Sequence, residues 1–64
     1  MSDREERFEK MLRSIQKEYS DTVTKMERLK AEDKTKTASY RQLLGEKLML
    51  QNILSRYRIY GLLN

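Results

Sequence analysis

Apolar side chains in the first half of the chain recur at alternating spacings of four and three residues. This spacing places them on one stripe of a helix, as in the seam of a coiled coil. Residues 2–5 also match a capping box, in which a serine and a glutamate three residues apart mark a helix start. The pattern therefore predicts a helix over residues 3–31. The stripe consists of Phe8, Leu12, Ile15, Tyr19, Thr22, Met26 and Leu29.

The second half of the chain carries apolar residues over roughly 240° of a helix circumference at 100° per residue. One neighbouring helix cannot cover so wide an arc. We therefore expect a helix over residues 39–60 that contacts the first helix on one side and a second protein surface on the other. The residues expected at this partner or dimer interface are Leu43, Leu50, Ile53, Leu54, Tyr57 and Tyr60.

Residues 30–40, KAEDKTKTASY, join the two predicted helices without a glycine or a proline. The seven-residue phase of the first stripe carries across them and places Asp33 and Lys36 in seam positions. That continuity favours a single helix of about 58 residues, a rod about 87 Å long at 1.5 Å per residue. A break at Gly45 into three segments is a further alternative, because glycine destabilises a helix interior.

Three features instead favour a turn over residues 32–38. A continuous seam would contain two adjacent charged layers. The hydroxyl groups of Thr35, Thr37 and Ser39 compete for backbone hydrogen bonds. Residues 39–42 form a second capping box, which predicts that the second helix starts at Ser39. We therefore predict an all-α fold, a single-domain antiparallel two-helix hairpin.

In this hairpin, residues whose numbers add up to about 70 face each other. Leu12 is then paired with Tyr57, and Phe8 with Leu62 in the short tail, residues 61–64. Gly61 follows a last turn that contains two arginines, and we expect it to end the second helix in a left-handed conformation.

Charge is distributed unevenly along the chain, whose net charge is +4. Residues 1–33 hold eight Lys/Arg and nine Asp/Glu, whereas residues 34–64 hold six Lys/Arg and one Glu. In a hairpin, the acidic half lies against the basic half. In the first helix we expect four pairs, each with an acid four residues before a base, to stabilise the helix by about 0.2–0.5 kcal/mol apiece. They are Asp3–Arg7, Glu6–Lys10, Glu9–Arg13 and Asp21–Lys25.

The chain has 64 residues and contains neither cysteine nor histidine. Disulfides, thiolate or imidazole metal ligands, and the usual imidazole base are therefore excluded, and we expect no cofactor. A two-helix hairpin of this size buries too little apolar surface on its own. We therefore expect it to form a homodimer, a four-helix bundle with the second helix at its centre.

The start of the chain lacks the apolar core of a secretory signal, and no run of residues is apolar enough to span a bilayer. We expect a soluble, cytoplasmic protein without a membrane partner.

These features predict a non-enzymatic protein–protein interaction or regulatory module that binds through a helical surface. The alternative is binding of RNA or DNA by the basic second half, with tyrosines available to stack on bases. The candidate nucleic-acid contacts are Lys34, Lys36, Arg41, Arg56 and Arg58.

Overall fold

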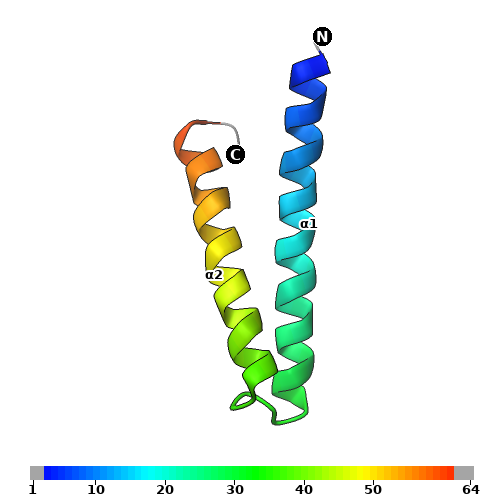
Figure 1. Cartoon of the computed structure of the whole chain (residues 1–64), viewed down its shortest axis with the longest axis vertical. Coiled ribbons are helices and arrows are strands. Elements are labelled where there is room, and N and C mark those ends of the chain that lie inside the picture. The colour runs from blue at the N-terminus through cyan, green and yellow to red at the C-terminus, as the bar shows by residue number, and fades with distance from the viewer. Residues whose placement is uncertain (1–2, 62–64) are drawn as a thin grey trace.

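The structure is a computed structural model that describes residues 3–61. These residues form two helices, α1 (Asp3–Ala31) and α2 (Ala38–Ile59), which lie side by side in opposite directions (Figure 1). The molecule measures 47 × 19 × 18 Å. The predicted hairpin is confirmed, and the rod is wrong. The break at Gly45 is also wrong, because α2 continues through this residue.

The two helices meet along the predicted seam. Met26 and Thr22 of α1 and Leu50 of α2 are the buried side chains among residues 3–61. The flanking seam positions are half-buried, and at the end away from the turn Phe8 packs edge-to-face on Tyr57. Their ring centroids are 5.3 Å apart. Tyr57 thus contacts a residue one helical turn beyond its predicted partner, and the predicted contact of Leu62 lies outside the described residues.

The turn after α1 contains a left-handed residue that is not glycine. Asp33 has φ 58°, its N–H donates to the carbonyl of Lys30 at 3.1 Å, and the N–H of Lys34 donates to the carbonyl of Leu29 at 2.8 Å. These two bonds form a Schellman motif, which satisfies the last carbonyls of a helix. Aspartate tolerates this conformation better than most residues. Asp33 and Lys36 are both exposed, so neither lies in the seam.

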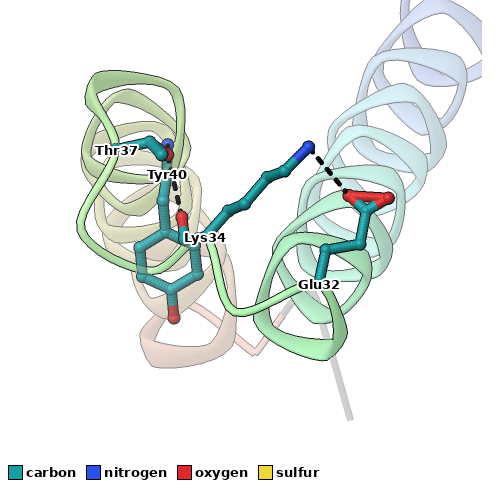
Figure 2. Close-up of polar contacts among 4 residues, drawn as sticks. All are labelled: Glu32, Lys34, Thr37 and Tyr40. Carbon is teal, nitrogen blue, oxygen red and sulfur yellow. Dashed lines mark hydrogen bonds and ion pairs between the residues drawn. The ribbon is translucent and has the colours of Figure 1, made fainter.

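α2 begins at Ala38 with Thr37 as its N-cap, one residue before the start predicted at Ser39. Thr37 has an extended backbone, φ −86° and ψ 159°, and its hydroxyl accepts the N–H of Tyr40 at 3.2 Å. The same hydroxyl donates to the carbonyl of Lys34 at 2.8 Å, and the Nζ of Lys34 lies 3.6 Å from Glu32 (Figure 2). An N-cap residue lies just outside the helix, where its side chain can accept the N–H of the residue three positions on. Thr37 meets this condition, whereas Ser39 already lies inside α2.

α2 ends at a left-handed glycine, as predicted. Gly61 has φ 73° and donates its N–H to the carbonyl of Arg58 at 3.0 Å, which confirms the left-handed C-cap. The first predicted capping box rests on Ser2, which lies outside the described residues. α1, with 29 residues, extends beyond α2, with 22 residues, at this open end (Figure 1).

The hairpin exposes more surface than a folded protein of its mass should. The accessible area is 5548 Å², whereas a compact monomer of 7.7 kDa exposes about 4,300 Å². The surplus is about 1,200 Å², and no side chain among residues 3–61 is buried completely. Two helices in contact along one seam leave the flanks of both helices in solvent.

Candidate interaction surfaces

The seam separates two broad faces of the hairpin. On one side, at the open end, lies an apolar recess of about 330 Å³ lined by Phe8, Ile53, Arg56, Tyr57 and Tyr60. Tyr60 is 79% exposed, and Phe8 is 39% exposed despite its contact with Tyr57. Aromatic side chains that are rigid and partly exposed are typical anchors of protein interfaces.

The same side continues toward the turn as a more polar groove of about 360 Å³. Its apolar members are Met49 and Leu50, which lie opposite Thr22. Its charged members are Glu18, Asp21, Lys25 and Glu46. Met11, which is 55% exposed, precedes Glu18 by seven residues, or about two helical turns, and so lies on this side as well. We call this side the Tyr60 face, defined by Phe8, Met11, Met49, Ile53 and Tyr60.

The opposite side is the Leu48 face, defined by Leu44 and Leu48, which are 39% and 56% exposed. Leu48 precedes Ser55 by two turns, and Ser55 lines a small groove of about 190 Å³ with Tyr19 and Leu54. A second groove on this side, nearer the turn, contains half-buried Lys47. The Leu48 face therefore has fewer exposed aromatic anchors than the Tyr60 face.

The six predicted interface residues do not share one degree of exposure. Leu50 is buried and Tyr60 is exposed, and the other four are half-buried along the seam. Most of these side chains recur at seven-residue spacing and therefore lie on the side of α2 that packs against α1. The hairpin itself thus covers much of the apolar arc that was predicted to bind a partner. The sequence prediction missed Met49, although Met49, Ile53 and Tyr60 recur at helical spacing on the flank of α2.

The five predicted nucleic-acid contacts fall into two groups. Lys34, Lys36 and Arg41 lie in the turn and the first turn of α2, whereas Arg56 and Arg58 lie in its last turn. Arg41 and Arg56 are separated by about 22 Å of helix at 1.5 Å per residue. The structure does not gather these cations on one surface, and nucleic-acid binding stays a prediction.

One of the four predicted ion pairs of α1 is present. Arg13 Nη1 lies 3.8 Å from Glu9 Oε2, and both side chains are exposed, so the pair contributes little to stability. Within residues 3–61, the other three predicted pairs are wrong, because their charged groups do not approach within 4 Å. The charges left without an ion pair on α1 therefore include Asp3, Arg7, Asp21 and Lys25.

The described residues hold no group of three or more acidic side chains placed to bind a metal ion. Within residues 3–61, neither helix is long and apolar enough to cross a membrane. Comparisons with protein-family models, with curated proteins and with solved structures give no match.

Proposed function

We propose that this chain is a protein–protein interaction module, a helical hairpin that acts by packing an exposed apolar face against another protein. The observation that carries the proposal is the surplus of exposed surface, about 1,200 Å² beyond that of a compact monomer of this mass. Stable interfaces bury about 800 Å² on each partner, so one interface of ordinary size would cover most of this surplus.

Where the apolar side chains lie supports the same proposal. Among residues 3–61, the large apolar side chains with exposure above one third are Phe8, Met11, Leu44, Leu48, Met49, Ile59 and Tyr60. They are grouped on the flanks of the seam and on the outer side of α2, and the far side of α1 is polar. Grouped apolar side chains with a polar rim are typical of binding surfaces.

Site-specific photo-crosslinking in the cells that make the protein tests this proposal. A photoreactive side chain replaces Met11, Leu48 or Tyr60 in turn, and a fourth variant carries it in place of Lys17, an exposed residue on the polar side of α1. We expect a discrete crosslinked adduct from at least one apolar position and none from Lys17. The proposal fails if the apolar positions give no more adduct than Lys17 while circular dichroism shows that every variant is helical.

A further inference from the structure

We infer that the partner is a second copy of this chain, packed antiparallel through the Tyr60 face to form a four-helix bundle. The inference rests on the proposed function and names the occupant of the binding surface. It follows from the placement of the exposed apolar residues and from a repeated charge pattern on α1.

The apolar evidence favours the Tyr60 face over the Leu48 face. Of the seven large apolar side chains of residues 3–61 with high exposure, four belong to the Tyr60 face and two to the Leu48 face. Of the two recesses at the open end, the one lined by Ile53 and Tyr60 lies on the Tyr60 face, whereas the other is formed by α1 alone and is lined mainly by charged side chains. A self-complementary surface of this kind is the usual basis of a two-fold symmetric dimer.

The charge evidence concerns two acid–base pairs on α1. Asp3 and Arg7 precede Asp21 and Lys25 by 18 residues each, which is five complete helical turns, so all four side chains lie on one stripe. Asp21 and Lys25 line the groove of the Tyr60 face, which places Asp3 and Arg7 on the same face near the open end. No ion pair joins any of these four residues to another described residue.

Antiparallel packing satisfies these charges between chains. When α1 lies on α1 of the second copy with Ser14 at the centre, residue numbers that add up to 28 face each other. Asp3 of one chain then lies opposite Lys25 of the other, and Arg7 lies opposite Asp21. The two-fold axis repeats both pairings. The same centre brings Met49 of α2 alongside Tyr60 of the second chain, so apolar residues meet on α2 as charges meet on α1.

The parallel arrangement through the same face lacks this complementarity. In that arrangement α1 of one copy lies on α2 of the other at the same height, because the two-fold axis runs along the hairpin. The groove of one copy would then meet the same groove of the other, and its three acids, Glu18, Asp21 and Glu46, outnumber its one base, Lys25. Like charges that face each other disfavour an interface, and this repulsion selects the antiparallel orientation.

Analytical ultracentrifugation of the full chain over a range of concentrations measures the dimer dissociation constant. Met11→Glu and Leu48→Glu form a matched pair, because the two side chains are 55% and 56% exposed on opposite faces. We expect Met11→Glu to raise the dissociation constant about tenfold or more, and Leu48→Glu to leave it within about twofold of the wild-type value. The reverse order of effects overturns the inference.

A charge-reversal experiment tests the orientation. Arg7→Glu places two acids opposite each other in a homodimer, and Asp21→Arg places two arginines opposite each other, so each variant alone should dimerise more weakly. A mixture of the two variants restores both pairings, Glu with Arg and Asp with Arg. We expect the mixture to form heterodimers with about wild-type affinity. If both variants are helical by circular dichroism, failure of the mixture to exceed either variant alone overturns the antiparallel arrangement.

The two proposals fail in different ways. A wild-type chain that stays monomeric throughout the concentration range overturns the homodimer. In that case, crosslinks from Met11 or Tyr60 to a different protein in cells would still support an interaction module. The absence of both dimer and crosslinks would refute both proposals.

Discussion

Replacing Thr37 with alanine tests how the second helix begins. The Thr37 hydroxyl accepts the N–H of Tyr40 at 3.2 Å and donates to the carbonyl of Lys34 at 2.8 Å. Loss of an N-cap threonine lowers the free energy of unfolding by about 1 kcal/mol, within a range of about 0.5–2 kcal/mol. The bond to Lys34 is exposed, and water replaces it at little cost. We therefore expect Thr37→Ala to destabilise the hairpin by about 1 kcal/mol.

Ser39→Ala is the matched control for this change. Ser39 lies inside α2, is exposed, and forms no side-chain hydrogen bond within residues 3–61. Alanine has a higher helix propensity than serine, so this substitution should raise the free energy of unfolding by up to about 0.5 kcal/mol. The two substitutions, two residues apart, are therefore expected to act in opposite directions.

Thermal and urea unfolding followed by far-ultraviolet circular dichroism measure both variants. A loss of 1 kcal/mol lowers the melting temperature of a domain of this size by about 4–8 °C. All proteins must be compared at one concentration, because association makes apparent stability depend on concentration. A larger loss for Ser39→Ala than for Thr37→Ala would refute the reasoning and would show that the helix starts at the second capping box.

Three further substitutions test other parts of the hairpin in the same unfolding assay. Leu50→Ala should lose about 2–5 kcal/mol because Leu50 is buried in the seam, whereas Met49→Ala, one residue away and exposed, should lose much less; similar losses would contradict the assigned seam. Gly45→Ala should gain about 1 kcal/mol, because an added Cβ meets no atom within 4 Å; a loss would indicate that another chain approaches this backbone. Asp33→Val should lose about 1–2 kcal/mol because of the left-handed φ of 58°, whereas Asp33→Gly should be neutral or slightly stabilising; equal effects would exclude strain at this residue.

Periodicity was sufficient to predict two helical segments, because the stripe from Phe8 to Leu29 shows which side of α1 is apolar. The choice of a hairpin over a rod came from the junction, where charged seam positions, hydroxyl side chains and a second capping box oppose the continuous seven-residue phase. The turn was harder to predict in detail. Aspartate adopts the left-handed conformation less often than glycine or asparagine, so Asp33 carries only a weak sequence signal. Threonine and serine are both good N-cap residues, so which of Thr37 and Ser39 caps α2 depends on the residue at which the backbone becomes helical.

The candidate interface was predicted less well than the fold. Helical periodicity gives the width of the apolar arc on α2, but it does not say how much of that arc the first helix covers. The hairpin leaves Leu50 only 4% exposed and covers Leu43, Leu54 and Tyr57 in part, so the exposed apolar residues are found on the flanks. The exposed apolar residues can therefore be identified only when it is known which side of α2 faces α1.

The left-handed residue in the turn makes this chain a candidate for domain swapping. If residues 32–37, which include the left-handed Asp33 and the extended Thr37, all adopted helical backbone angles, the seven-residue phase would continue from α1 into α2, and the two helices would become one. Two such chains, paired antiparallel, would keep every seam contact of the hairpin but make it between molecules. At their crossing point, Asp33 of one chain would lie opposite Lys36 of the other. The backbone torsions of one short turn thus separate a closed hairpin from an exchanged dimer built from the same contacts.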